Sequence, residues 1–234
     1  MKGEVRANLE LVKQRIARAA ERAGRSPEEI HLVAVSKSVD LERIRQAVEA
    51  GVEALGENRV QEAREKIRVL GRPVPWHLIG SLQTNKARDA LELFDLIHSV
   101  DRPSLAQELD QRARASGRRV RVLVQLNLAQ EVTKHGVGPG EFKPLMELLA
   151  ECSGLEVCGL MTIPPAASDP EASRPWFRRL RELRESARSW NLPGITLDHL
   201  SMGMSDDFEV AVEEGATIVR IGTAIFGPRN PQKD

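Results

Sequence analysis

Apolar residues recur along this chain in short runs that alternate with segments of helical spacing. The runs are rich in β-branched residues and predict strands, whereas the segments between them carry one apolar face at a period of 3.6. Alternating strands and helices imply parallel strands joined by right-handed crossovers. The predicted strands are residues 31–36, 53–56, 76–79, 93–98, 120–126, 155–160, 195–198 and 217–221, and the predicted helices are residues 41–50, 60–70, 84–91, 104–115, 140–152, 170–190 and 206–214.

An additional helix is predicted before the first strand. Leu9, Val12 and Ile16 recur at helical spacing and Gly24 ends the pattern, so residues 1–24 are assigned to it. Eight strand–helix units in 234 residues favour a closed (β/α)8 TIM barrel, in the α/β class, over an open sheet. The alternative is a doubly wound sheet, but no GxGxxG loop follows the first strand. We expect a single domain over residues 1–234 with a flexible polar tail at 228–234.

Composition and charge argue against several classes of partner and location. The chain has 34 basic and 34 acidic residues with a formal net charge of zero, and their interspersed pattern argues against a nucleic-acid partner or a membrane surface. The N-terminus is charged and no stretch approaches the roughly 20 apolar residues of a membrane span, so we expect a cytoplasmic protein. No large exposed apolar stripe is evident, so we expect a monomer.

Lys37 closes the first strand-like run, Leu32-Val33-Ala34-Val35-Ser36. In α/β architectures the carboxyl ends of the strands form the ligand-binding mouth. A lysine there can hold an anion, or its amine can attack a carbonyl, and burial favours the neutral amine that attack requires. The alternative is a lysine that extends to solvent and pairs with Asp40.

Residues 217–227 form a second informative stretch, in which a strand ends at Gly222 and Thr223 opens a short helical turn. A glycine lets a ligand approach the backbone, and the N–H groups of a helix start attract anions. Barrels frequently bind phosphate after the seventh and eighth strands. Ser201 lies at the predicted seventh strand's end and is the preferred phosphate ligand, whereas Ser205 is interpreted as a helix N-cap.

Arg220 precedes Gly222 by two residues, so its side chain is expected on the same side of the strand as the anion site. A guanidinium so deep needs a partner, either a barrel carboxylate such as Glu57 or a ligand. Asn58 follows the second strand, and its spacing to Gln61 is compatible with helix capping or with a ligand contact.

Histidines and cysteines raise the possibility of a metal site. His77, His98 and His199 fall on or just after strands, which keeps a metal-dependent hydrolase as a third hypothesis, but the first strand supplies a lysine and no His-x-His motif. We therefore interpret these histidines as hydrogen-bonded structural residues and expect no metal. The spacing of Cys152 and Cys158 fits neither a zinc knuckle nor a redox pair, so both are predicted to be small buried residues.

An amine facing an anion site suits a ligand that is both an aldehyde and a phosphate, and pyridoxal phosphate has both groups. The sequence motifs agree, because nearly the whole chain resembles the pyridoxal phosphate homeostasis protein family. The motifs that carry the resemblance are Ala34-Val35-Ser36-Lys37, Gly56-Glu57-Asn58, His77-Leu78-Ile79-Gly80-Ser81-Leu82-Gln83-Thr84-Asn85-Lys86, Gly159-Leu160-Met161-Thr162-Ile163, Leu200-Ser201-Met202-Gly203-Met204-Ser205-Asp206 and Arg220-Ile221-Gly222-Thr223 through Gly227.

The resemblance implies a barrel like the N-terminal domain of alanine racemase, binding pyridoxal 5′-phosphate (PLP) for vitamin B6 homeostasis without known catalytic turnover. It implies no catalytic residues, and apo PLP-dependent enzymes as possible recipients of the cofactor. Carried over to this chain, it assigns the Schiff base to Lys37, the phosphate to Ser201, Gly222 and Thr223, the pyridine nitrogen to Arg220, the side of the ring to Asn58, and further pocket contacts to His77, Met202 and Gly203.

Arg220 also bears on the chemistry that the cofactor would support. An arginine stays protonated and only donates, so a pyridine nitrogen opposite it remains an unprotonated acceptor and the ring is a weak electron sink. Transaminases and decarboxylases need an acidic partner at that position, which makes those reactions unfavourable here.

The chain departs from some relatives beside the Schiff-base lysine. Those relatives carry further lysines there, which the resemblance links to cofactor transfer, whereas Ser38 and Val39 follow Lys37 here. Any transfer through lysines would use others, such as Lys134 or Lys233.

A racemase-like enzyme is the alternative function. Alanine racemases take their opposite base, a tyrosine, from a second domain across a dimer, whereas this chain ends soon after the eighth unit and has no tyrosine. His199 or His77 would have to replace that base, so we expect a carrier protein.

Overall fold

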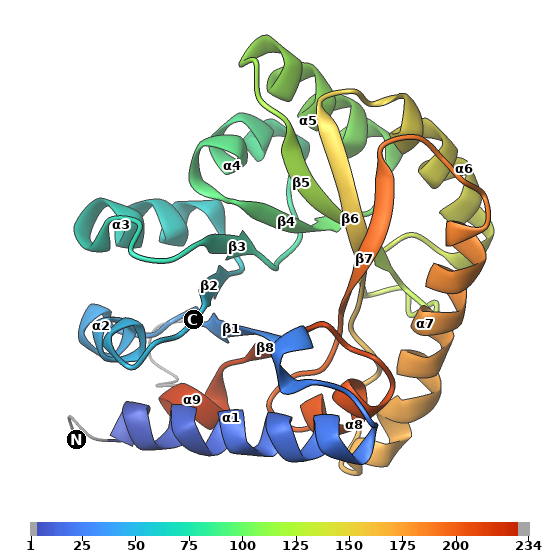
Figure 1. Ribbon diagram of the computed structural model, residues 1–234. Coiled ribbons are helices and arrows are strands. Elements are labelled where there is room, and N and C mark those ends of the chain that lie inside the picture. The colour runs from blue at the N-terminus through green and yellow to red at the C-terminus, as the bar shows by residue number, and fades with distance from the viewer. Residues whose placement is uncertain (1–3, 229–234) are drawn as a thin grey trace.

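The computed structural model describes residues 4–228, in which eight parallel strands close into a barrel in chain order (Figure 1). The TIM-barrel prediction is therefore confirmed, and the doubly wound sheet is wrong. The barrel closes between the first and last strands, where Leu32 pairs with Val219. The strands are β1 (His31–Val35), β2 (Ala54–Glu57), β3 (Trp76–Leu78), β4 (Leu96–Val100), β5 (Val120–Leu126), β6 (Leu155–Thr162), β7 (Ile195–Ser201) and β8 (Ile218–Ile221).

Helices surround the barrel on its outer face (Figure 1). Short 3-10 turns lie at Pro27–Glu29, directly before β1, and at Thr84–Lys86 and Pro170–Ser173, each directly before a helix. The α-helices are α1 (Glu4–Arg22), α2 (Leu41–Glu49), α3 (Val60–Leu70), α4 (Ala87–Leu93), α5 (Pro103–Ala115), α6 (Pro139–Glu151), α7 (Arg174–Arg188), α8 (Phe208–Glu213) and α9 (Thr223–Phe226).

The extra N-terminal helix, α1, lies across α8 and α9 (Figure 1). Its apolar face is buried, and polar contacts fix its register: Asn8 Nδ2 donates to the Ile225 carbonyl at 3.1 Å, and Arg15 pairs with Glu209 at 2.7 Å. The helix therefore braces the segment that follows β8. Residues 1–3 of the predicted helix, and the predicted flexible tail except for Pro228, lie outside the described residues.

Two apolar layers hold the fold together. The larger lies between the strands and the helices, and the smaller fills the barrel interior with Val33, Leu96, Leu123 and Met161 among others. Both cysteines are buried as predicted, and burial raises the pKa of each thiol, that of Cys152 to about 11. None of the helices among residues 4–228 combines the length and the apolar character that a membrane crossing requires.

Candidate functional site

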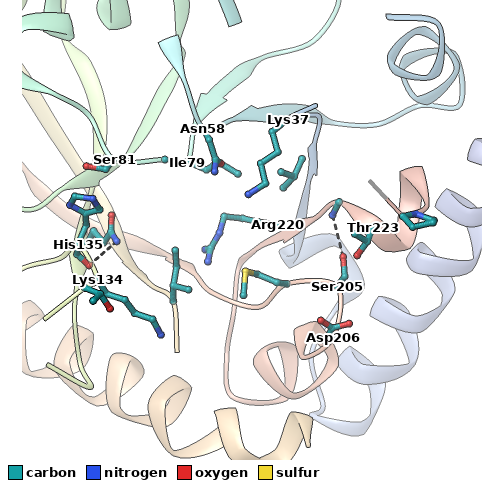
Figure 2. Close-up of a pocket in the computed structure, with 18 residues that line it drawn as sticks. Lys37, Asn58, Ile79, Ser81, Lys134, His135, Ser205, Asp206, Arg220 and Thr223 are labelled. Carbon is teal, nitrogen blue, oxygen red and sulfur yellow. Dashed lines mark hydrogen bonds between the residues drawn. The ribbon is translucent and has the colours of Figure 1, made fainter. Parts of the chain in front are cut away.

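A cavity of about 750 Å³ opens at the carboxyl ends of the strands (Figure 2). Its wall comes from the ends of β1, β5 and β8 and from the loops that follow β2, β3, β6 and β7. Segments from across the whole chain therefore meet in it, which is the usual place for a ligand in a closed parallel barrel. Of the predicted site residues, those that line the cavity are Lys37, Asn58, Arg220, Gly222 and Thr223.

Lys37 lies two residues beyond the end of β1 and projects into the cavity (Figure 2). Side chains alternate along a strand, and this alternation continues past Val35. Val33 and Val35 face the barrel interior or the cavity, whereas Ser36 turns outward to the layer below α3. The same alternation brings Lys37 to the inner side, half-buried at the cavity wall.

Arg220 lies in the floor of the cavity and is only 3% exposed. Its Nη1 donates to Ser201 Oγ at 2.7 Å and its Nη2 donates to the Thr162 carbonyl at 3.0 Å. Burial lowers the pKa of the guanidinium to about 10, which still leaves it charged at neutral pH. Glu57 is not its partner, because that carboxylate bonds to Ser36 on the outer side of the barrel.

Ser201, His98 and His77 continue the hydrogen-bonded chain away from Arg220. Ser201 Oγ lies 2.9 Å from His98 Nδ1, and His98 Nε2 lies 3.1 Å from His77 Nδ1. Neither Ser201 nor His77 belongs to the cavity wall, and Ser201 is fully buried. The structure therefore does not bring the predicted phosphate ligand Ser201, or the predicted pocket residue His77, to the cavity.

Met202 and Gly203 also lie behind the wall of the cavity. Met202 is fully buried, and the Gly203 carbonyl accepts a hydrogen bond from the Arg220 backbone N–H at 3.0 Å. A side chain at position 203 would collide with α8, since an added Cβ would lie 2.5 Å from the Ala211 Cβ. Gly203 thus holds the backbone of Arg220, and neither Met202 nor Gly203 belongs to the described cavity wall.

Ser205 lies where the sequence interpretation placed only a helix cap. Its Oγ accepts hydrogen bonds from the backbone N–H groups of Gly222 and Ala224, each at 3.3 Å, and it lines the cavity (Figure 2). The N-cap position of α8 is Asp207, so the capping interpretation of Ser205 is wrong. The sequence signal that could have identified Ser205 is a hydroxyl in the loop after the seventh strand, opposite the glycine and helix start that follow the eighth strand.

Asn58 lines the cavity and does not cap α3, whose N-cap position is Arg59. The loop after β3 packs directly on it, because an added Cβ at Gly80 would lie 2.3 Å from the Asn58 carbonyl oxygen. The absence of a side chain at Gly80 therefore lets the loops after β2 and β3 form one continuous wall.

The charges that line the cavity favour an anion. Lys37, Lys134 and Arg220 contribute positive charge, whereas Asp206 is the single carboxylate in the described part of the lining. Lys134 reaches the cavity from the loop after β5, donates to the Pro164 carbonyl at 3.0 Å and pairs with Glu131. A wall with this balance attracts a small anionic ligand.

The remaining histidine, His199, lies at the opposite end of the barrel. Its ring packs edge-on against His31, the first residue of β1, and its Nε2 lies 3.3 Å from Arg121 Nη2. Among residues 4–228, no three histidine, cysteine or acidic side chains come together in a way that could hold a metal ion. The hydrolase hypothesis required the three histidines to meet at the mouth of the barrel, and they do not.

Comparisons with known proteins agree on one family. Residues 7–230 match the family described as "Alanine racemase, N-terminal domain". A curated relative from Aquifex aeolicus, named "Pyridoxal phosphate homeostasis protein", is 49% identical over 223 residues, which cover 94% of this chain and 96% of that protein.

Solved structures give the same result. PipY of Synechococcus elongatus, determined with PLP bound, is 38% identical with a TM-score of 0.80, and the match covers 91% of this chain and 100% of that one. An alanine racemase from Clostridium difficile has a TM-score of 0.77 at 18% identity, over 99% of this chain and 58% of the racemase. The second likeness shows a shared fold.

Proposed function

We propose, because this chain belongs to the pyridoxal phosphate homeostasis protein family, that it binds PLP as a Schiff base on Lys37 and serves in vitamin B6 homeostasis. The observation that carries the proposal is the meeting of Lys37 and Arg220 in one cationic cavity at the barrel mouth. The PLP-bound PipY structure, a full-length relative of this chain, supports the choice of cofactor.

The cavity residues fit the chemical groups of this cofactor. When bound, PLP supplies an aldehyde carbon that a lysine amine attacks, and an aromatic ring that accepts electrons. Lys37 provides the amine, and Arg220 has N–H groups beyond its two internal hydrogen bonds that can donate to the pyridine nitrogen. Asn58 lies at the wall beside the space for the ring.

The phosphate would bind at the start of α9. Ser205 Oγ accepts from the N–H groups of Gly222 and Ala224, so these donors are directed toward a pocket-lining acceptor that phosphate oxygens can supplement or replace. Thr223 adds a hydroxyl at the same place. Within the proposal, the phosphate contact expected of Ser201 passes to Ser205, because Ser201 is buried beneath Arg220.

We propose that the protein carries PLP and does not catalyse a reaction with it. The relatives are named for homeostasis, and an arginine opposite the pyridine nitrogen keeps the ring a weak electron sink. Apo PLP-dependent enzymes are the proposed recipients, with Lys134 placed in the cavity wall to assist release. A monomeric state and a cytoplasmic location complete the proposal, and sedimentation of the purified protein would test the first.

The attachment of PLP to Lys37 can be tested by reductive trapping. Wild-type protein treated with PLP and borohydride should gain one covalent adduct, which peptide mass spectrometry locates on Lys37. Lys37→Ala should lose the yellow absorbance and the adduct, whereas Lys134→Ala should keep both, because Lys134 lines the same cavity without holding the cofactor. A full-intensity adduct in Lys37→Ala would refute the assignment.

A further inference from the structure

A buried ammonium group lies directly outside β1 and β2. Lys66 of α3 is only 7% exposed, and its Nζ donates to the Ser36 carbonyl at 2.6 Å, to Glu57 Oε1 at 2.8 Å and to Glu62 Oε1 at 2.6 Å. All three ammonium protons therefore have acceptors. Glu57, itself fully buried, also accepts a hydrogen bond from Ser36 Oγ at 2.6 Å.

This network holds the two peptide groups that flank Lys37. The carbonyl of Ser36, which accepts from Lys66, belongs to the peptide bond before Lys37. The N–H of Ser38, which donates to Glu62 Oε1 at 2.7 Å, belongs to the peptide bond after it. Ser38 has a φ of 58°, an unfavourable backbone conformation for a residue other than glycine, so the surrounding contacts must hold it there.

The network of Lys66, Glu57 and Glu62 has more acidic than basic groups. One ammonium faces two carboxylates, and Glu57 Oε2 is buried without a hydrogen-bond partner. Burial raises the pKa of Glu57, while Lys66 opposes that rise. A buried pair of this kind contributes little net stability compared with an apolar replacement, so another reason for its presence is worth seeking.

We propose that Lys66, together with Glu57 and Glu62, is a positioning unit that fixes the backbone of Lys37 so that its amine points into the cavity. The inference rests on the proposed function, since it concerns the same lysine. None of the three side chains belongs to the cavity wall, so they act through the peptide groups beside Lys37 and not on the ligand. Fixing a nucleophile in advance lowers the entropic cost of bond formation.

The test separates attachment from binding. Pyridoxine 5′-phosphate has the ring and phosphate of PLP but no aldehyde, so its affinity reports the cavity without the covalent step. Lys66→Met should lower the second-order rate of borohydride-trappable attachment of PLP to Lys37 by roughly tenfold or more. Its affinity for pyridoxine 5′-phosphate should stay within about twofold of wild type, because the cavity wall is unchanged.

Two further variants make the outcome decisive. Lys13→Met is the matched control, because Lys13 is an exposed lysine that also donates to a carbonyl, that of Gly51 at 2.9 Å, and it should behave as wild type. Glu62→Leu removes the acceptor of the Ser38 N–H but keeps the Lys66–Glu57 pair, so it should slow attachment even if Lys66→Met fails to fold.

The possible failures are distinguishable. Trapping of wild-type protein that yields no Lys37 adduct would refute the proposed function itself. A Lys37 adduct that forms at the wild-type rate in a folded Lys66→Met or Glu62→Leu protein would overturn the positioning unit. Equal losses of affinity for PLP and for pyridoxine 5′-phosphate would also overturn it, because they would indicate general damage to the barrel mouth.

Discussion

The hydrogen-bonded side chains from Arg220 through Ser201 and His98 to His77 are satisfied when both imidazoles are neutral. Arg220 can only donate, so Ser201 Oγ accepts from it and has its own hydrogen available for His98 Nδ1. In this arrangement His98 carries its proton on Nε2 and donates to His77 Nδ1. Both imidazoles are then neutral Nε2–H tautomers, and protonation of His77 at Nδ1 would place two N–H groups face to face.

These hydrogen-bonded histidines lead us to predict that the protein loses stability in mild acid. Burial lowers the pKa of His77 to about 4 and that of His98 well below its usual range. The unfolded chain, with histidine pKa values near 6.5, binds more protons, so stability falls as the pH drops from about 6.5 to about 4. From its pKa alone, His77 is expected to contribute up to about 3 kcal/mol over that interval.

Urea unfolding at pH 7 and at pH 5 would measure this effect. His77→Gln should reduce the loss of unfolding free energy between the two pH values. His31→Gln, which changes an exposed histidine of β1 that pairs with Glu53, provides the comparison outside this hydrogen-bonded group. Equal pH dependence in wild type and His77→Gln would contradict the neutral state of the two paired histidines.

Single residues also show what the sequence could and could not predict about the site. Lys37, Arg220 and Gly222 were predictable because strand ends and strand alternation place side chains reliably. Ser205 lines the cavity and Ser201 does not, for a structural reason that the sequence pattern does not reveal. Because β7 continues to Ser201, that side chain points into the barrel, and the loop beyond it carries Ser205 to the mouth.

At the level of elements, the loop between β7 and α8 positions much of the site. Gly203 has a φ of 91° and packs against α8, where an added Cβ would lie 2.9 Å from the Phe208 Cα. Its carbonyl holds the backbone of Arg220 in β8. The loop can follow this path only with glycine at position 203, because both the conformation and the space exclude a side chain.

Gly203→Ala should therefore destabilise the protein by about 2–4 kcal/mol through backbone strain and overpacking combined. Gly117→Ala is the control, since Gly117 also has a positive φ, of 65°, but its Cβ would meet nothing within 4 Å. That variant should cost about 1 kcal/mol, from conformation alone. If the two variants had the same unfolding midpoint, the contact between position 203 and α8 would not add to the loss of stability.

Element boundaries were predicted best where apolar patterns end at a turn residue, as for α3 between Val60 and Leu70. The fourth strand was placed at 93–98 but runs from Leu96 to Val100, because Leu93 and Phe94 continue the apolar pattern while belonging to the end of α4. The seventh strand was placed at 195–198, too short by three residues, since its polar end faces polar partners inside the barrel.

At the level of the whole molecule, the placement of basic side chains around the cavity decides whether the barrel could support racemisation. Racemisation removes a proton from one face of the substrate and returns one to the other, so it needs a base on each side. Lys37 can serve one face. The sequence has no tyrosine, and the two alternatives considered for the second base, His77 and His199, lie in the hydrogen-bonded chain and at the opposite end of the barrel.

We therefore expect PLP-loaded protein not to racemise amino acids. Chiral chromatography of L-alanine and a panel of other amino acids, after long incubation, should show no more D-isomer than Lys37→Ala produces. His135 is the matched probe, because it is the imidazole that lines the described cavity and its side chain is exposed at the mouth. Sustained turnover that disappears in both Lys37→Ala and His135→Ala would identify a second base there and overturn the carrier function.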